Sequence, residues 1–204
     1  MHNITKIQLE GLYNTRDLGY FKSLDDNRFG GNVADYLYFT NELDGVGGVK
    51  VYPAWNGGGT VKVVIIDSDY NKPSEKLVND VQTAIDPIPN QGIGKGIAPI
   101  GHTVSVYGVG ETIINISTHI TFQEGYTWED VKPRFIASLK EYFKEVQAAW
   151  ADTENVVIRT SYIETRALNV VGVLDIQHTS INGLQQNAVI DKDNIPVLGE
   201  VELT

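Results

Sequence analysis

The sequence predicts an α+β fold made of two small α/β modules with mixed sheets. One indication is a β-hairpin within residues 43–67, with a helical pattern on each side of it. Another is a weaker copy of the hairpin's opening strand at residues 168–176. The two halves share their parts in a different order, so the second module resembles a circular permutation of the first. We expect a helical lead-in over residues 1–29, the first module over residues 30–109 and the second over residues 110–204. The alternative is one continuous sheet through both halves.

The hairpin is the clearest element of the chain. Apolar and polar side chains alternate over residues 49–52, and Val61, Val63 and Ile65 fall on one face of the following run, with the two-residue period of β-strands. Between the runs stands Asn-Gly-Gly-Gly at residues 56–59. Asn followed by Gly is the strongest short-range signal for a chain reversal, because both residues tolerate positive φ.

Helices and one further strand complete the first module. Residues 9–24 show a helical face, although two glycines weaken it. Asn32 is suited to cap a second helix, and Pro73 with Ser74 opens a third that stops at the Asp-Pro pair of residues 86–87. The second helix is expected to place on one side the residues Val33, Leu37, Thr40 and Leu43. A strand is predicted over residues 102–109.

The second module opens with an alternating strand over residues 112–122 and continues into the best amphipathic helix of the chain, from Thr127 to Trp150. Pro133 implies either a kinked first turn or a regular helix that starts near this proline. Ser161 and Glu164 form a capping box for a later helix. Further strands are predicted at residues 156–158, 171–176 and 200–203, the last of which offers an edge to a partner.

Composition excludes several function classes. The 204 residues carry 26 acidic and 16 basic side chains and a formal charge of −10. A nucleic-acid binder needs a basic stripe, and none is visible. The longest apolar run, residues 63–66, is far shorter than the roughly 20 residues of a membrane helix. We therefore expect no nucleic acid and no membrane insertion. The absence of cysteine excludes disulfides and thiolate chemistry. No signal peptide is visible, which fits assembly in a cytoplasm.

Motifs that carry chemistry fail their tests. The loop at residues 92–96, Gly-Ile-Gly-Lys-Gly, is not a phosphate loop, because its lysine precedes glycine and it leads into a strand. An interdomain or subunit-contact loop is the favoured interpretation. Ser161 lies in no nucleophile elbow. No histidine pair has the spacing of a zinc site, and solvent-facing side chains are expected for the four histidines, His2, His102, His119 and His178.

Two acidic clusters remain as weak candidates for calcium binding or acid–base chemistry. One pairs Asp67 with Asp69, and the other joins Asp191, Asp193 and Asn194. Neither matches an EF-hand loop, and solvated turns are the favoured interpretation. We therefore expect no catalytic, cofactor-binding or metal-binding residues and no enzyme.

One candidate partner contact lies at the hairpin tip, where Trp55 precedes Asn56 and Gly57. A tryptophan beside a turn either folds back over its sheet or faces a partner, where aromatic anchors dominate binding. Trp150, at the end of the amphipathic helix, is expected in the core.

The order and spacing of several segments resemble the baseplate J family of contractile-tailed phages and prophage-derived, PBSX-like tail particles. The resemblance runs through Gly-Gly-Asn-Val-Ala-Asp-Tyr at residues 30–36, Gly-Val-Gly-Gly-Val-Lys-Val at residues 45–51 and Ile-Ala-Pro-Ile-Gly at residues 97–101. It continues through residues 114–146 and Ile-Pro-Val-Leu-Gly at residues 195–199. It covers nearly the whole chain from about residue 14, and no single motif in it is diagnostic.

The resemblance implies a structural role. Family members are wedge components of the baseplate that assemble with other tail proteins around a central hub and rearrange when the tail contracts. No catalytic residues are carried over. Because family members usually have more chain before the Gly-Gly-Asn stretch, the resemblance is to the C-terminal part of such a protein. The other open interpretation is a tail-tip binding module for a cell-surface glycan or receptor that uses Trp55 and the loop acids.

Overall fold

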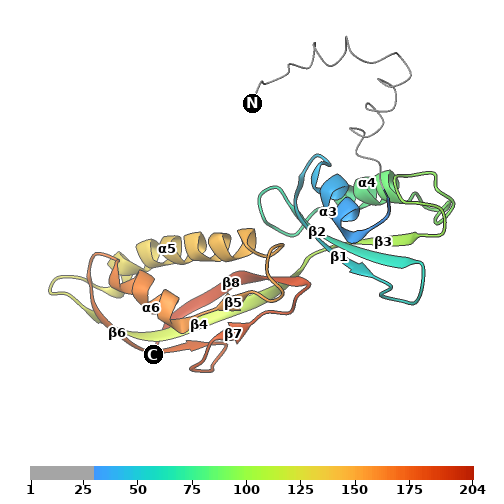
Figure 1. Ribbon diagram of the computed structural model, residues 1–204. Coiled ribbons are helices and arrows are strands. Elements are labelled where there is room, and N and C mark those ends of the chain that lie inside the picture. The colour runs from blue at the N-terminus through green and yellow to red at the C-terminus, as the bar shows by residue number, and fades with distance from the viewer. Residues whose placement is uncertain (1–29) are drawn as a thin grey trace, which may run out of the picture.

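The computed structural model describes residues 30–204, and the predicted lead-in and the helix at residues 9–24 lie outside this range (Figure 1). The first module holds α3 (Val33–Asn41), β1 (Val46–Pro53), β2 (Thr60–Asp67), α4 (Glu75–Ile85) and β3 (Thr103–Gly108). The second holds β4 (Gly110–Phe122), α5 (Trp128–Ala148), β5 (Val157–Ile158), α6 (Thr160–Leu168), β6 (Val173–Ile181), β7 (Ala188–Val189) and β8 (Asn194–Leu203). The α+β prediction with two sheet modules is confirmed.

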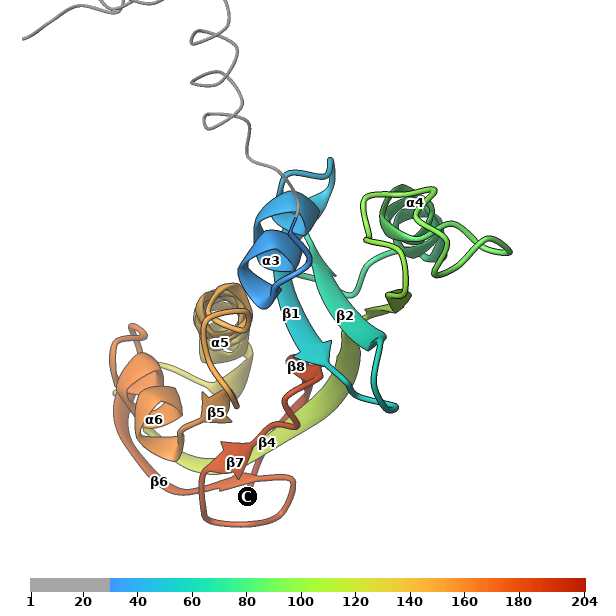
Figure 2. The ribbon, with the colours of Figure 1, turned by 45° about the vertical axis from the view of Figure 1, so that its right-hand side comes forward.

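The first sheet has the order β1-β2-β3, with β1 and β2 antiparallel and β2 and β3 parallel. Helices α3 and α4 lie over one face of it (Figure 2). That face is apolar because every second residue of each strand points to it. Its core is built from Val49 on β1, Val63 and Ile65 on β2, Val104 on β3 and Tyr36 on α3.

The predicted caps of this module are confirmed. Asn32 Oδ1 accepts a hydrogen bond from the Asp35 amide at 3.0 Å, and Ser74 Oγ accepts one from the Leu77 amide at 3.2 Å. The predicted buried side of α3 is partly wrong, because Tyr36 is buried and Val33 is 42% exposed. The mixed aromatic and aliphatic sequence of α3 leaves its orientation to be set by the sheet beneath it.

The hairpin is confirmed, with a longer turn than a two-residue Asn-Gly reversal. Residues 54–59 connect the strands, and φ is positive at Ala54, Gly57 and Gly59. A side chain at Gly59 would place its Cβ 2.8 Å from the Gly101 carbonyl oxygen. Glycine is required there by both the backbone angle and the close approach of the neighbouring chain.

Side chains seal the outer edge of β3. Asp86, which is 1% exposed, accepts hydrogen bonds from the amides of Gly92 and Val104 at 3.0 and 2.9 Å. Gln82 accepts from the Val106 amide at 2.8 Å and donates to the Val104 carbonyl at 3.0 Å. The backbone groups that a further strand would use are therefore already paired within the module.

The second sheet has the order β6-β4-β8, with β4 antiparallel to β6 and parallel to β8. Helix α5 starts at Trp128 after Thr127, whose amide and hydroxyl donate to the Asp130 carboxylate at 2.9 and 2.7 Å. Pro133 lies inside this helix, so the alternative of a start near Pro133 is wrong. The helix packs on the sheet through residues spaced by three and four, which include Val131, Phe135, Leu139, Tyr142 and Phe143.

The circular permutation accounts for part of the second module. In each sheet the middle strand has one antiparallel and one parallel neighbour. If the second module were a circularly permuted copy of the first, the strand directly after its first helix would be the parallel neighbour of its middle strand. In the second module β5 holds that position but pairs with β7 in a separate sheet, and β8 supplies the parallel neighbour at the end. The alternative of one continuous sheet is wrong, because the described strands form three sheets.

Two boundaries in the second module differ from the prediction. Ser161 does not cap α6, which begins at Thr160, because Asn187 Oδ1 accepts from the Thr160 amide at 3.1 Å. The last strand starts at Asn194, earlier than residue 200. Pro196 reads as a breaker in the sequence, but β8 is an edge strand, where a missing N–H is tolerated.

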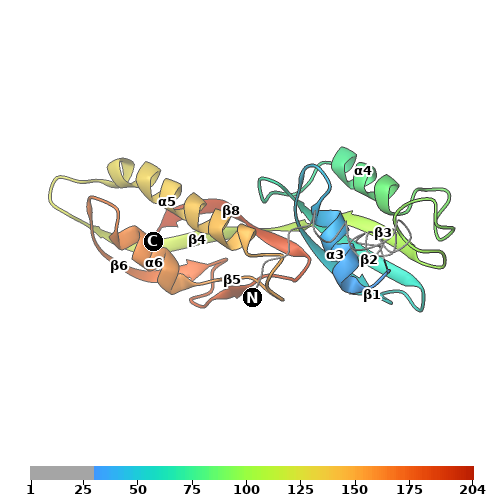
Figure 3. The same cartoon turned by 45° about the horizontal axis from the view of Figure 1, so that its top comes forward.

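The two modules lie end to end (Figure 3). Val109, which connects β3 to β4, is fully buried, and its amide donates to the Ile65 carbonyl at 2.9 Å. Within residues 30–204, no helix combines the length and apolar character needed to cross a membrane.

We expect Gln82→Ala to destabilise the chain by about 1–3 kcal/mol, because it leaves the buried Val106 amide without its acceptor. Urea unfolding followed by circular dichroism would measure this difference. Asn79→Ala, at an exposed position of the same helix, is the matched control. An equal effect of both variants would show that helix propensity, and not the sealed edge, is responsible.

Candidate functional site at the module junction

The helix-free face of the first sheet forms the junction between the modules. On β2, Lys62, Val64 and Ile66 point to this face, opposite to the residues that pack under the helices. Val64 and Ile66 are each 1% exposed and belong to the apolar core of the second module. Because β2 is buried on both faces, the second module completes the core of the first.

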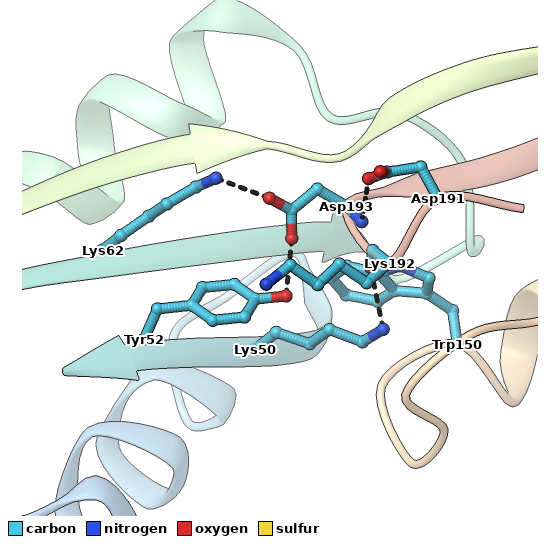
Figure 4. Close-up of polar contacts among 7 residues, drawn as sticks. All are labelled: Lys50, Tyr52, Lys62, Trp150, Asp191, Lys192 and Asp193. Atoms are coloured by element: carbon cyan, nitrogen blue, oxygen red, sulfur yellow. Dashed lines mark hydrogen bonds and ion pairs between the residues drawn. The ribbon is translucent and has the colours of Figure 1, made fainter. Parts of the chain in front are cut away.

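Asp193, in the loop before β8, connects the two modules. Its Oδ2 accepts from Lys62 Nζ at 2.5 Å, and its Oδ1 accepts from the Tyr52 hydroxyl at 2.5 Å (Figure 4). Its own amide donates to Asp191 Oδ1 at 2.9 Å, which fixes the loop. One carboxylate therefore holds side chains from two neighbouring strands, β1 and β2.

Lys50 makes a second connection beside it. Its ammonium donates to the carbonyls of Lys192 and Glu154, at 2.8 and 3.2 Å, and lies 4.6 Å from the Trp150 ring centroid (Figure 4). The Trp150 indole N–H donates to the same Lys192 carbonyl at 3.0 Å. Trp150 is fully buried, as predicted. Two loops of the second module, the one after α5 and the one before β8, are thus fixed to β1 by one lysine.

Small residues permit this close approach. Gly48 lies on β1 where Ala151 of the second module covers it, and a Cβ at Gly48 would stand 2.9 Å from the Ala151 Cβ. Any side chain at this position would push the loop after α5 away from the sheet.

The ionisable groups at the junction shift one another's pKa values. Burial opposes ionisation of Asp193, but hydrogen bonds from Lys62 and Tyr52 outweigh it and hold the pKa of this carboxyl below its ordinary value of 3.8. Burial and the hydrogen bond to Asp193 raise the pKa of the Tyr52 hydroxyl. Burial lowers the pKa of Lys50, against the attraction of Asp193. The junction therefore holds an ionised Asp193 carboxylate beside a Tyr52 hydroxyl that keeps its proton near neutral pH.

The hairpin tip lies further out on the same sheet. Trp55 is 43% exposed, and its ring meets the edge of Tyr107, with 6.1 Å between centroids. Asn56 donates its amide to Thr60 Oγ1 at 3.0 Å, and nothing lies within 4 Å of a Cβ built on Gly57. The two alternatives for Trp55 are thus combined, since one edge packs on the sheet and the rest faces solvent. Its role as a partner contact stays a prediction.

The other candidate residues serve local structure. Asp67 Oδ1 accepts from the amides of Asp69 and Asn71 at 3.0 and 2.7 Å, which makes a turn. His119 lies within 2.8 Å of the Thr204 carbonyl. His102 is not simply solvent-facing, because its Nδ1 lies 2.9 Å from the hydroxyl of the buried Tyr36. Within residues 30–204, no cluster of three or more potential ligands suits a metal ion.

The loop at residues 92–96 does not lie between the modules. The amides of Ile97 and Ala98 donate to the carbonyls of Ala84 and Ile85 at 3.1 and 2.9 Å, which fix the loop to the end of α4. The interdomain interpretation of this loop is therefore wrong. The sequence analysis also missed the junction role of Asp193, although apolar Val64 and Ile66 on the face of Lys62 carried the signal.

Comparison with known families identifies both halves of this arrangement. Residues 28–108 match the baseplate J-like central domain, and residues 114–204 match the baseplate J-like protein C-terminal domain. The chain belongs to the baseplate J-like family. The resemblance inferred from the sequence is thereby confirmed.

Three individual proteins are also similar to this chain. It is 35% identical over 184 residues to the uncharacterized protein YqbT of Bacillus subtilis (strain 168), and 33% identical over 184 residues to the phage-like element PBSX protein XkdT of that strain. Each alignment covers 90% of this chain and 51% of the relative. The chain therefore spans about half the length of these curated relatives. A third relative, baseplate protein gp47 of Escherichia phage Mu, is 31% identical over 99 residues, which cover 46% of this chain and 27% of gp47.

A solved baseplate shows the same fold. The cryo-EM structure of the anti-feeding prophage (AFP) baseplate contains a chain that matches with a TM-score of 0.59 at 7% identity. The match covers 92% of this chain and 42% of that one. The arrangement of both modules is thus found in a baseplate protein whose sequence has diverged almost completely.

We expect Asp193→Asn to destabilise the baseplate J-like chain by about 1–2 kcal/mol, because Lys62 loses its charged acceptor at a partly exposed site. Chemical denaturation would measure it, and Lys62→Met combined with Asp193→Asn would give the coupling between the two residues. Asp191→Asn, in the same loop, controls for loop effects. A double-mutant cycle without coupling would contradict the ion pair.

The pH dependence of that difference has a definite sign. The pKa of Asp193 is lower in the folded chain, so its contribution is present above the ordinary value of 3.8 and is lost as the pH falls through the lower folded value. The stability gap between wild type and Asp193→Asn should therefore close in acid. A gap that stays constant down to about pH 2 would contradict the lowered pKa.

Proposed function

We propose that this chain is the C-terminal part of a structural wedge component in a contractile-tail baseplate of a phage or prophage, and that it acts through protein–protein assembly. The match of two consecutive baseplate J-like domains, over residues 28–108 and 114–204, carries this proposal. We also propose that the modules divide at residues 109–110, as the sequence analysis predicted.

The use of charged residues supports an assembly role without enzymatic activity. Asp193, which the sequence analysis weighed for calcium binding or acid–base chemistry, is paired with Lys62 across the junction. Asp67 is used by its own turn. Side chains that stabilise one fixed arrangement of two modules suit a component whose task is to hold neighbours in place.

The proposed partners are other baseplate and tail proteins, in an oligomeric particle assembled in the bacterial host cytoplasm. The proposed contact at the hairpin tip uses Trp55, Asn56 and Gly57. Trp55 supports it, because its aromatic area is already held on Tyr107 and would lose little freedom on binding.

Immunogold electron microscopy tests the assignment. Tail particles released from the source bacterium would be decorated with antibody raised against this chain. We expect label at the baseplate end of the particles, with particles from a strain lacking the gene as the control. Label along the tube, or none on particles shown to expose the epitope, would contradict the proposed location.

A receptor- or glycan-binding module is the second candidate, favoured by the exposed pair of Trp55 and Tyr107.

Under the assembly proposal, Trp55→Ala should lower incorporation into particles severalfold and leave stability within about 0.5 kcal/mol of wild type. Leu184→Ala, at another exposed apolar residue, is the control. Saturable binding of the isolated chain to a glycan array, abolished by Trp55→Ala and retained by Trp55→Phe, would support the second candidate.

A further inference from the structure

The outer edge of β1 has unpaired backbone groups. The Ala54 amide donates to the Thr60 carbonyl at 2.7 Å, which marks residues 54, 52 and 50 as those that bond to β2. Val49 and Val51 therefore direct their N–H and C=O groups away from β2. The Ile65 carbonyl, opposite Val49, confirms this alternation, because it accepts from Val109 on the other side of β2.

No hydrogen bond to the outward groups of Val49 or Val51 occurs among residues 30–204. Pro53, the next outward residue, has no N–H to leave unpaired, as is typical of an edge strand. The contrast with β3 is informative, since Asp86 and Gln82 seal the opposite edge of the same sheet. One edge is closed by side chains of its own module. The other is covered at Val49, which is 2% exposed, and is open for pairing at the partly exposed Val51 and the exposed Pro53.

A groove of about 370 Å³ runs along this open edge. Helix α3 forms one wall with Val33 and Leu37, and the loop after α5 forms the other. Val49 and Val51 line the groove between them. An apolar wall beside an unpaired strand edge has the two features that strand addition uses, which are backbone hydrogen bonds and pockets for alternate side chains.

The charged side chains that line the groove favour a basic occupant. Asp152 and Glu154 lie exposed on the loop wall, and neither belongs to an ion pair within the described chain. Lys50 and Lys192 are directed into the junction, toward backbone carbonyls and the Tyr52 ring. A second copy of this chain, with a formal charge of −10, would bring its own acidic groove wall against this one.

We propose that β1 is a strand-addition site for an extended segment of a partner protein in which apolar residues alternate with lysine or arginine. The apolar side chains pack on Val33 and Leu37, and the basic ones face Asp152 and Glu154. The backbone of the segment pairs with Val51 and with the Pro53 carbonyl. The first sheet would thereby gain a strand beside β1.

Strand addition at β1 gives the proposed assembly function a class of partner. It rests on that proposed function only for the biological role of the added segment. Its test uses the isolated chain. Baseplate label without peptide binding would reject strand addition alone, and peptide binding without baseplate label would reject the proposed location alone.

The probe is a short peptide of alternating valine and lysine with blocked ends, titrated into the full chain. We expect saturable binding by fluorescence anisotropy, and amide hydrogen exchange at Val51 slowed by about tenfold or more on addition of the peptide. The same peptide N-methylated at every amide keeps its charge but cannot donate hydrogen bonds, and should not bind. A valine–glutamate peptide should bind at least about tenfold more weakly.

Asp152→Asn with Glu154→Gln should weaken binding of the valine–lysine peptide by about tenfold, because the loop wall loses both charges. Glu124→Gln with Glu202→Gln removes the same charge at exposed positions outside the groove and should leave binding unchanged. The proposal would be overturned by equal binding of the N-methylated peptide, by equal loss in both double variants, or by unchanged exchange at Val51.

Two further outcomes would assign the groove to another occupant and also overturn it. One is a dimer in sedimentation velocity in which the Val51 amide is protected from exchange, which would identify a second copy. The other is protection of the Val51 amide in the monomer without peptide, which would show that the chain fills its own groove.

Discussion

The burial of β2 on both faces is the constraint on which the structure depends. One face carries Val63 and Ile65 under the helices of the first module, and the other carries Val64 and Ile66 in the core of the second. A three-stranded sheet with helices on one side would otherwise expose an apolar face to water. The second module removes that face from water, so each module contributes to the stability of the other.

The polar groups around this shared core fix how the modules sit. An ion pair with side chains 23% and 24% exposed contributes little net stability, because desolvation offsets much of the attraction. Its value lies in geometry, since Asp193 can satisfy Lys62 and Tyr52 together only in one relative position of the loop and the hairpin. Apolar burial thus supplies the affinity between the modules, and the carboxylate supplies the orientation.

Local signals in the sequence predicted most of the elements correctly. Asn32, Ser74 and Thr127 start the helices they were expected to start, because a cap depends on residues three positions apart. Features set by distant partners were missed. Ser161 was predicted as the cap of α6, but the helix begins at Thr160, whose amide contact with the distant Asn187 is invisible in a local window. The long β8 depends on pairing with β4, which lies some eighty residues earlier in the sequence. The pairing begins with Gly110 opposite Asn194.

The residues of the candidate site also divide into those placed by local sequence and those placed by distant partners. Trp150 could be placed in the core because its spacing on an amphipathic helix is local information. The junction could not be placed, because the partner of Lys62 is Asp193, far along the chain. An apolar residue at every position from Val63 to Ile66 was nonetheless a usable sign, since a strand with one wet face would alternate.

The residues that link the two modules, Val109 and Gly110, do not form a free hinge. Val109 is buried and bonded to Ile65, and the Gly110 amide donates to the Asp193 carbonyl at 2.8 Å, so the linking residues are held on both sides. A hinge needs residues whose φ and ψ change without loss of packing, and these residues do not meet that condition. The link between the modules is therefore packed and hydrogen-bonded in place, and a change in how the modules sit would have to break the contacts of Val109 and Gly110.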